Sequence, residues 1–468
     1  MVIGGTCDTV GVAGCWLSGC YGAFSKKFGN GALNMLSARV VLANGKLVTA
    51  SECSHPDLFW SLRGGGGGVA GVVTEFVART HPTPTHVTSM SVSTSANTSK
   101  EYHSLVKEGL KVYASVTQDR DQAPNGGVGF SRSHIAGTDS YQWDFSINIQ
   151  GYESDPAKQR ALLQPLMEYA NNQPVNGSVY GHASLSTVQT WLASDFDPAA
   201  KWGSAPNGTL PWAQYSGEKS SSTGGGPNGV VGMQSKFIPQ HYIETESGRS
   251  NLASTLMRVS EEIGGASFMT PKGQVGIPDE QKKWFAKTSL NPVILDAAGT
   301  LFSFDQIPWL AQLPPSSTSL RGIWGGKLNQ TIESFTTGDP NRTAEIRALC
   351  DEGAAGNESA AVRCLHTWQF ELIPQHQKKV DRVRKILDTD LPNVDQSGSP
   401  FSGSYWSETD YFEQNFQLSY WGAEKYKRLL AVKRAYDPDG LFVCHHCVGS
   451  EYWTAASHLN CRNRSMEY

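Results

Sequence analysis

The residues with the clearest chemical potential lie near the start of the chain, in the stretch 4–22 (GGTCDTVGVAGCWLSGCYG). This stretch holds six glycines and three cysteines within nineteen residues. Glycine loses much backbone entropy on folding, so this density favours a loop whose backbone approaches a ligand and offers N–H groups. Cys7 stands at the entry of the loop as a thiol that could bond covalently to that ligand. From these residues alone, a set of surface turns is the alternative.

A second run of glycines, residues 64–68, lies between a predicted helix and a predicted strand. Ser54 is the expected N-cap of the helix, Pro56 lies in its first turn, and Gly64 ends it. Residues 71–77 (GVVTEFV) predict a buried strand. A helix, a glycine loop and a buried strand also suit a ligand cradle, although packing alone could require some of these glycines.

The elements that must position these loops follow from periodicity and turn residues. Residues 38–42 and 46–49 flank Asn44-Gly45, a strong hairpin signal. Beyond Pro82 and Pro84, the pattern predicts helices and strands of an α+β domain with an antiparallel sheet. The expected helices are 102–116, 158–169, 252–263 and 377–387, the expected strands are 143–149 and 367–372, and 203–230 is an expected loop. A helix over 423–436 is closed by Asp437-Pro438-Asp439-Gly440.

Composition excludes several classes of protein. The chain has 468 residues and a formal net charge of −4 with no long basic run, so nucleic acid is not an expected partner. No apolar run is long enough to span a bilayer, and residues 1–10 do not form a signal peptide. Nine cysteines and seven Asn-x-Ser/Thr sequons, at Asn97, Asn176, Asn207, Asn329, Asn341, Asn357 and Asn463, indicate a secreted protein whose leader is absent from this sequence. Cys350 and Cys364 bracket a small hydrophilic loop and are an expected disulfide pair.

Three separated blocks resemble the berberine-bridge-enzyme-like flavoprotein oxidases of the vanillyl-alcohol-oxidase/PCMH superfamily. The first block is C-x-T-V-G-V-x-G over residues 7–14, extending to Gly22 and continuing at 37–41 (SARVV). The second is 56–63 (PDLFWSLR) with the glycines 64–68 and residues 71–73. The third comprises 405–410 (YWSETD), 421–422, 436–442 (YDPDGLF) and 448–451 (VGSE). All three in this order make a chance match implausible.

The resemblance implies an α+β protein that joins the second half only of a PCMH-type FAD-binding domain to an α+β substrate domain built on an antiparallel sheet. Residues 1–82 correspond to the C-terminal half of the FAD-binding domain and 83–399 to the substrate domain. Residues 400–455 form a berberine-bridge-like segment that returns to the FAD domain, and 456–468 form a tail. Because the family carries an earlier half-domain, the resemblance also implies an N-terminally truncated chain with poor FAD affinity and exposed apolar surface.

The resemblance also assigns expected cofactor contacts. Cys7 would form a thioether to FAD, and the backbone of Thr9, Val10, Gly11, Val12 and Gly14 would line the flavin. On the second block, Gly71, Val72 and Val73 would touch the cofactor. On the third block, Tyr405 would lie over the ring on the substrate side, with Ser407 two residues later where the family usually has Asn.

Two residues are candidates for catalysis, Tyr405 and Gln369. Tyr405 is the expected base, but a phenol with a pKa near ~10 needs a nearby positive charge for that role, and a buried tyrosine with a satisfied hydroxyl is the equal alternative. Gln369 lies on the predicted strand 367–372 where the family places polar pocket residues, and its expected role is hydrogen bonding to substrate. Glu371 is expected to be exposed or paired, and His366 to be structural.

The chain departs from the family's pattern at its cysteines. Cys15 and Cys20 add two thiols to the first block, and they could pair with each other. The consecutive residues 444–447 (CHHC) look like a zinc site, but one tetrahedral ion is not easily held by four neighbouring side chains, so no metal is expected.

The sequence therefore predicts a monomeric FAD-dependent oxidase. It would move a hydride from an alcohol carbon of a sugar or secondary metabolite to flavin N5, with dioxygen as the acceptor. The alternatives are a flavin dehydrogenase of the same fold, and an inactive truncated or secreted binding protein.

Overall fold

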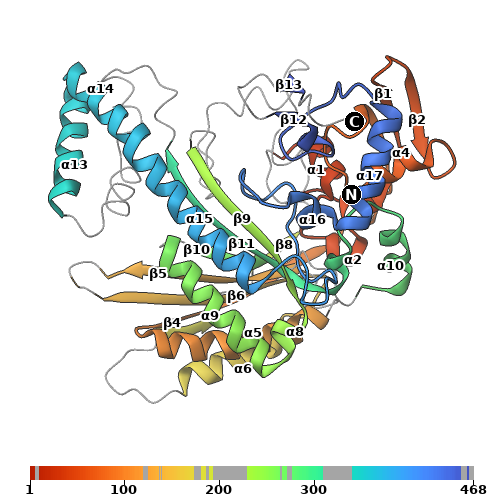
Figure 1. The fold of residues 1–468 in the computed structure, drawn as a ribbon. Coiled ribbons are helices and arrows are strands. Elements are labelled where there is room, and N and C mark those ends of the chain that lie inside the picture. Colours follow the sequence, from red (N-terminus) through yellow and green to blue (C-terminus); the bar gives the residue numbers. More distant parts are fainter. Residues whose placement is uncertain are drawn as a thin grey trace, which may run out of the picture.

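A computed structural model describes residues 1–5, 10–119, 125–135, 138, 140–172, 181–185, 189–192, 229–263, 266–270, 277–308, 340–454 and 461–462 (Figure 1). The strands are β1 (Met35–Leu42), β2 (Leu47–Ser51), β3 (Gly71–Ala78), β4 (His86–Ala96), β5 (Asn125–His134), β6 (Tyr141–Tyr152), β7 (Gly181–Leu185), β8 (Gln189–Leu192), β9 (Gly229–Pro239), β10 (Ala266–Thr270), β11 (Ala297–Pro308), β12 (Trp453–Thr454) and β13 (Cys461–Arg462).

The helices of the described ranges belong to both halves of the molecule. They are α1 (Val12–Ser18), α2 (Ser25–Phe28), α3 (Gly31–Asn34), α4 (Pro56–Leu62), α5 (Ser99–Gln118), α6 (Pro156–Asn171), α8 (His241–Glu244), α9 (Glu246–Ile263), α10 (Asp279–Ala286), α13 (Pro340–Ala355), α14 (Glu358–Thr367), α15 (Ile373–Asp390), α16 (Phe416–Trp421) and α17 (Ala423–Tyr436). Two 3₁₀ turns, Pro292–Asp296 and Ser450–Tyr452, and a π-helical segment, Trp368–Leu372, complete the set. None of the described helices has both the length and the apolar composition needed to cross a bilayer.

The small sheet is antiparallel and has the order β2-β1-β3. Its hairpin forms around Asn44 and Gly45 as predicted, with Val40 opposite Val48. One face packs on α4 and α17 through a core that includes Val40, Leu58 and Leu429. The predicted strand 71–77 is confirmed as β3, but it is not buried along its length: Val72 and Val77 lie on the other face and are exposed.

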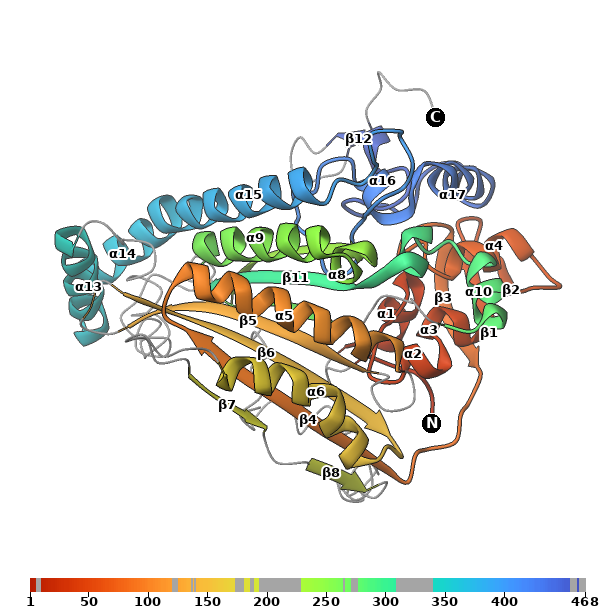
Figure 2. The same ribbon diagram turned by 90° about the horizontal axis from the view of Figure 1, so that it is seen from below.

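The large sheet has eight strands, and its main path runs β7-β4-β6-β5-β10-β11-β9, with β8 paired to β4. Neighbouring strands are antiparallel throughout this sheet. Helices α5, α6, α9 and α15 lie along one side of it, as both views show (Figures 1 and 2). The fold is therefore α+β with an antiparallel sheet, as predicted.

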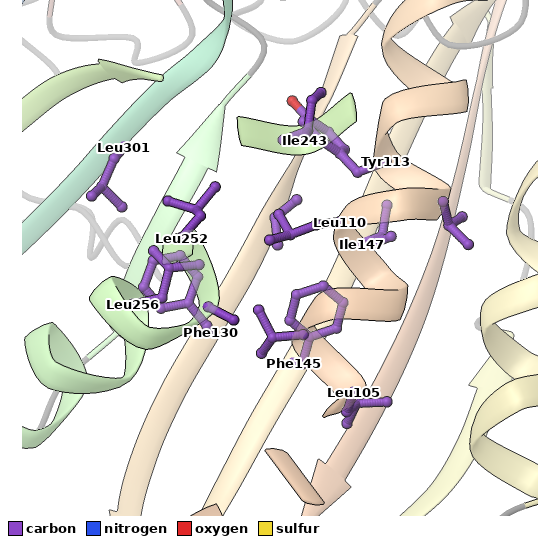
Figure 3. Close-up of a cluster of buried hydrophobic side chains, with 14 of the residues drawn as sticks. Leu105, Leu110, Tyr113, Phe130, Phe145, Ile147, Ile243, Leu252, Leu256 and Leu301 are labelled. Carbon is purple, nitrogen blue, oxygen red and sulfur yellow. The ribbon is translucent and has the colours of Figure 1, made fainter. Parts of the chain in front are cut away.

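The helix-covered face of the large sheet holds the main hydrophobic core. Alternate residues of β6, such as Phe145 and Ile147, point into it and are buried. They meet side chains of α5 and α9, including Leu110 and Leu256 (Figure 3). Because strand side chains alternate between faces, the intervening residues must point to the opposite side of the sheet.

That opposite side, here named the polar face, carries small uncharged polar residues and glycine, with one carboxylate. Most of its residues in β4, β5 and β6 are exposed or half-buried: Ser89, Ser91, Ser93, Ser95, Asn125, Gly127, Gly129, Ser131, Ser133, Gln142, Asp144, Ser146, Asn148 and Gln150. At one end of β4 and β6, Val87 and the opposite Tyr152 also point to this side and are buried. The register places Ser93, Ser146 and Gly129 in one cross-strand row that continues through Phe268 and Phe302 to Ser235 on β9. The polar face therefore extends toward β9.

Three sequence predictions about local structure are wrong. The stretch 4–22 is not a loop throughout, because Val12–Ser18, with Gly14 inside it, forms the helix α1. The segment 367–372 is not a strand: α14 continues through the π-helical Trp368–Leu372 directly into α15. The N-cap of α4 is His55, not Ser54, and it has a left-handed backbone with φ of 48°. The predicted helices 102–116, 158–169, 252–263, 377–387 and 423–436 and the strand 143–149 are confirmed within α5, α6, α9, α15, α17 and β6. Most of the predicted loop 203–230 lies outside the described residues.

Candidate functional site

Two glycine-rich segments that are distant in sequence meet at Leu17 in α1. The backbone N–H groups of Gly64 and Gly66 both donate to the carbonyl of Leu17, at 3.0 and 2.9 Å. Trp16 packs against Phe76 of β3, with ring centroids 5.7 Å apart. The loop after α4 is thereby held against α1, the helix that lies within the first glycine stretch.

The C-terminal block joins them through Trp406. Its indole lies over Gly66, where an added Cβ would come within 3.2 Å of the ring, and its Nε1 donates to the carbonyl of His446 at 3.2 Å. A side chain at Gly66 would therefore push the aromatic ring away. The three blocks that carry the sequence resemblance converge at this place in the molecule.

Tyr405 reaches the site from residues 402–405, which run beside β9. The backbone N–H of Phe237 donates to the carbonyl of Gly403 at 2.8 Å, and Ser404 Oγ donates to the carbonyl of Ser235 at 2.7 Å. The N–H of Tyr405 donates to Ser235 Oγ at 3.2 Å. Since a Cβ on Gly403 would lie 2.6 Å from the carbonyl of Ser419, only glycine allows this close approach. The large sheet thus fixes the backbone of Tyr405.

The Tyr405 hydroxyl is buried among groups from the first glycine stretch. It lies 3.2 Å from Ser18 Oγ and accepts the backbone N–H of Cys20 at 3.3 Å. Ser18 Oγ is also 2.6 Å from Ser407 Oγ. The ring of Tyr21 meets the Tyr405 ring edge-on at 5.0 Å. The sequence predicts Tyr405 and Ser407 as site residues. It does not predict Ser18, the Cys20 N–H or Tyr21, because the only feature that marks them is that they belong to the glycine-rich stretch.

Burial raises the pKa of Tyr405, while the hydroxyls of Ser18 and Ser407 act in the opposite direction. The Glu408 carboxylate adds to the rise and the Cys20 N–H opposes it. Burial also raises the pKa of Tyr21 well above its ordinary value, and the neighbouring Tyr405 adds to that effect. Both phenols are therefore protonated at neutral pH. Tyr405 can donate or accept a hydrogen bond, and its role as a base depends on donors that stabilise the phenolate.

The predicted cofactor loop is open to solvent where the structure describes it. Val10 and Val12 are 46% and 54% exposed, although both are apolar. Among the described residues, no heavy atom lies within 4 Å of a Cβ added to Gly11 or Gly14. Neither glycine is therefore explained by packing within this part of the chain, and the segment has the open apolar and backbone surface that a flat ligand would cover. Cys7 and Thr9 lie outside the described residues.

The predicted contacts on β3 point in two directions. Val73 packs against the core of the small sheet, whereas Val72 is 53% exposed on the other face. Gly71 is required by β1, because a Cβ there would lie 2.5 Å from the carbonyl of Val41. A ligand lying against this strand would meet Val72 rather than Val73.

The structure does not bring Gln369 to Tyr405. Gln369 lies in the π-helical segment, and Asp388, at the other end of the same continuous helix, pairs with Lys236 of β9 at 2.8 Å. Gln369 and Asp388 are nineteen positions apart along this helix, or about 28 Å. Glu371 is paired, as one predicted option had it, with Arg342 at 2.6 Å. His366 contacts Phe370, with rings 4.5 Å apart.

The cysteines of the described residues form three disulfides. The predicted pair Cys350–Cys364 is confirmed, and Cys15 bonds to Cys20. Cys444 and Cys447, which flank the two histidines of the CHHC motif, also form a disulfide, so their thiols are not available as metal ligands in this state. Cys53 is free and exposed.

Comparison with known proteins bears on the family and the fold of this chain. Residues 404–449, which include Tyr405 and Trp406, match the family model described as berberine and berberine-like. The predicted resemblance is confirmed. The FAD-linked oxidoreductase ZEB1 of Gibberella zeae is 26% identical over 461 residues, covering 97% of this chain and 61% of that protein. The chain spans 57–61% of the length of this and two further curated FAD-linked oxidoreductases that it matches.

Solved structures show the same fold. The VAO-type flavoprotein MtVAO713 of Myceliophthora thermophila superposes with a TM-score of 0.59 at 18% identity, covering 97% of this chain and 64% of that chain. The carbohydrate oxidase of Microdochium nivale superposes with a TM-score of 0.57 at 17% identity, covering 96% of this chain and 73% of that chain. The chain therefore has the VAO-type fold of these berberine-bridge-like relatives.

Proposed function

We propose that the protein is an FAD-dependent oxidase that removes a hydride from an alcohol carbon, with flavin N5 as the hydride acceptor and dioxygen as the final acceptor. One observation carries the proposal. The three blocks that carry the sequence resemblance converge, and the buried Tyr405 hydroxyl lies against Ser18 and the Cys20 N–H of the first glycine-rich stretch. In the same stretch, Gly11 and Gly14 leave space uncovered among the described residues.

The residues that would hold FAD are the open segment Val10–Val12 with Gly14, and Val72 on β3. Their exposure and the free space at Gly11 and Gly14 fit a bound flat ring system. Cys7 is the proposed covalent attachment point. When bound, FAD supplies the electron-accepting ring, and the chain supplies orientation and proton handling.

Ser18 and Ser407, whose hydroxyl oxygens are 2.6 Å apart, would turn their hydroxyls toward the phenolate form of Tyr405 and stabilise it. This phenolate would accept a hydrogen bond from the hydroxyl of the substrate and take its proton, becoming a neutral phenol. Burial of the tyrosine excludes water from this exchange, which strengthens each hydrogen bond to a charged oxygen.

The polar face favours a carbohydrate substrate. It presents hydroxyl and amide groups with a single carboxylate, Asp144, and it continues through one cross-strand row to Ser235, which bonds to the backbone of Tyr405. Neutral donors and acceptors in this arrangement suit a ligand with many hydroxyl groups. The carbohydrate oxidase of Microdochium nivale, whose fold is similar, supports the same substrate class.

The decisive experiment compares Tyr405→Phe with the exposed control Tyr411→Phe. Flavin absorbance retained after gel filtration measures FAD binding, and peroxide release over a panel of sugars and alcohols measures turnover. We expect Tyr405→Phe to keep its flavin and to lose about 10²-fold in kcat, since general-base assistance is typically worth at least that much. Tyr411→Phe should stay within about twofold of the unchanged protein.

Each other outcome has a consequence. Absence of retained flavin would contradict the FAD proposal. Turnover with an artificial electron acceptor but without peroxide release would support the dehydrogenase alternative. If acid precipitation removes the flavin colour from the unchanged chain as completely as from Cys7→Ala, the covalent role of Cys7 is contradicted.

We also propose a secretory, oxidising location. Three disulfides would persist only in such a compartment, and the sequon residues Asn341 and Asn357 are exposed. Expression in a eukaryotic secretory host should give a chain whose mass falls on treatment with an N-glycosidase. An unchanged mass would contradict passage through the secretory pathway.

A further inference from the structure

The disulfide Cys15–Cys20 closes the turn that brings hydrogen-bond donors to Tyr405. Cys15 lies in α1, and Cys20 lies two residues beyond the end of that helix. Between them, Ser18 supplies the hydroxyl that contacts Tyr405, and the backbone N–H of Cys20 donates to the same phenol oxygen. Two of the groups around the Tyr405 hydroxyl therefore lie inside or at the end of one six-residue disulfide loop.

The backbone of Cys20 has a left-handed conformation, with φ of 61°. This region is costly for a residue with a side chain, and such a residue stays there only when its surroundings hold it. Cys20 is held from two sides. Its carbonyl accepts the N–H of Gly31 at 3.0 Å, and its sulfur is bonded to Cys15.

The two donors to Tyr405 are not equivalent. Ser18 Oγ carries one proton and also lies 3.1 Å from the carbonyls of both Gly14 and Cys15, so it has other acceptors to choose from. The Cys20 N–H cannot turn away unless the backbone itself rotates. It is therefore the donor whose direction is fixed by the loop.

We propose that the Cys15–Cys20 disulfide is a positioning pair for catalysis, which holds the Cys20 N–H and Ser18 against Tyr405 and so stabilises the phenolate form of Tyr405, the form that accepts the proton of the substrate and becomes a neutral phenol. The inference rests on the proposed function of Tyr405. It explains how a tyrosine whose pKa is raised by burial can act as a base: the donors stabilise its anion. The glycine-rich stretch thus supplies hydrogen-bond donors for proton transfer, in addition to the exposed residues that would contact FAD.

The test uses Cys15→Ala/Cys20→Ala, with Cys350→Ala/Cys364→Ala as the matched control. The control removes a disulfide of the α13–α14 hairpin, which makes no contact with the site in the described residues. Each chain carries 3-fluorotyrosine at position 405, whose fluorine resonance is titrated with pH without added FAD. Peroxide release with FAD and the sugar or alcohol that the panel identifies is measured in parallel.

We expect the site variant to titrate at a higher pH than the unchanged chain and to lose about tenfold in kcat with KM within about twofold, because one hydrogen bond to a charged group is removed. The control should change neither value. Cys15→Ala/Cys20→Gly should recover part of the loss, since glycine adopts the left-handed backbone without strain. This variant also keeps the test open if the double alanine variant does not fold.

An unchanged fluorine titration in Cys15→Ala/Cys20→Gly and in the double alanine variant would overturn the inference. A shift of equal size in the control would overturn it as well, because the effect would then be a general loss of stability. An unchanged chain that releases no peroxide would contradict the proposed function, and the fluorine titration would still decide whether the disulfide positions the donors.

Discussion

Among the described residues, each of the two sheets has one face that helices cover and one face that they do not, and the uncovered faces differ in chemistry. On the large sheet, the uncovered polar face carries serine and amide side chains. On the small sheet, the uncovered face carries Leu47, Val41 and Val72 in one cross-strand row, beside the exposed ion pair of Arg39 and Glu75. The same two-residue alternation therefore produces a hydrophilic surface in one place and an apolar one in the other.

This difference separates two uses of exposed strands. A face of serine, asparagine and glutamine is stable in water and can bind a polar ligand without rearrangement. Leu36, Leu47, Val72 and Val77 are about half exposed, and apolar side chains gathered in this way typically mark a surface that binds something. The exposed apolar surface expected from the sequence is thus present on the small sheet.

The largest effect should come from the covered face of the large sheet. Phe145 is buried against α5, and its ring fits where Gly109 has no side chain. Phe145→Ala should lower the free energy of unfolding by about 3–5 kcal/mol through lost burial and a cavity. Chemical denaturation followed by circular dichroism measures this. The control is Ser146→Ala on the polar face, where a change within about 0.5 kcal/mol is expected; similar losses at both positions would contradict the assignment of the faces.

The small sheet should show the same contrast at a smaller scale. Val40 is fully buried on the covered face, and Val72 is half exposed on the other. Val40→Ala should cost about 2–3 kcal/mol, since two carbon atoms leave a packed site. Val72→Ala should cost about 0.5 kcal/mol or less. If Val72→Ala lowers the free energy of unfolding as much as Val40→Ala does, the face that carries Val72 is not exposed to solvent in the protein.

A pH effect should arise where the C-terminal segment packs on the small sheet. Burial, with a smaller contribution from neighbouring His445, lowers the pKa of His446 from 6.5 to about 4. The unfolded chain therefore binds more protons between these values, so this contribution to stability is complete above about 6.5 and is lost as the pH falls toward about 4. His446 has a φ of 53°, which asparagine tolerates, so His446→Asn is the suitable variant.

The measurement is the denaturation midpoint at steps of pH from neutral to acidic, for the unchanged chain and for His446→Asn. The difference between the two curves isolates the histidine from the carboxylates that titrate in the same range. The curves should diverge least at the acidic end, where the unchanged chain has lost the advantage of a neutral buried histidine. Parallel curves for the unchanged chain and His446→Asn would refute the assignment.

Much of this architecture was predictable because it depends on local signals. The hairpin at Asn44-Gly45, the helix α17 and the pair Cys350–Cys364 each follow from a few neighbouring residues. The segment 367–372 was not predictable in the same way. Its aromatic residues favour strands, and six residues are too few to separate the helical period from the strand period. Helices α14 and α15 on either side carry the helix through it.

The candidate site shows the same limit. The sequence resemblance pointed to Tyr405, but Ser18 lies 387 residues away in the chain, and no local pattern predicts that their hydroxyls meet. Gln369 was selected on the assumption of a strand that would reach the site. Once that segment is helical, the length of α15 separates it from β9 and Tyr405. Long-range packing, rather than residue type, decides which polar groups share a pocket.

The smallest expected effect on stability is the most informative about the polar face. Ser93 is exposed on β4, in the same cross-strand row as Ser235 of β9. Five strand spacings separate the two serines, a distance of about 24 Å. Ser93→Val makes this end resemble the exposed apolar face of the small sheet, and because valine favours strands the stability should change by no more than about 0.5 kcal/mol.

If a carbohydrate chain lies along the polar face, KM for an oligosaccharide should rise several-fold, while KM for a monosaccharide, too short to reach from Tyr405 to Ser93, should not change. The matched control is Thr94→Val on the covered face, which loses its bond to the carbonyl of Phe145 and so costs about 1 kcal/mol without changing either KM. If Ser93→Val has the same KM as the unchanged chain for the oligosaccharide as well as for the monosaccharide, the polar face serves solubility rather than binding.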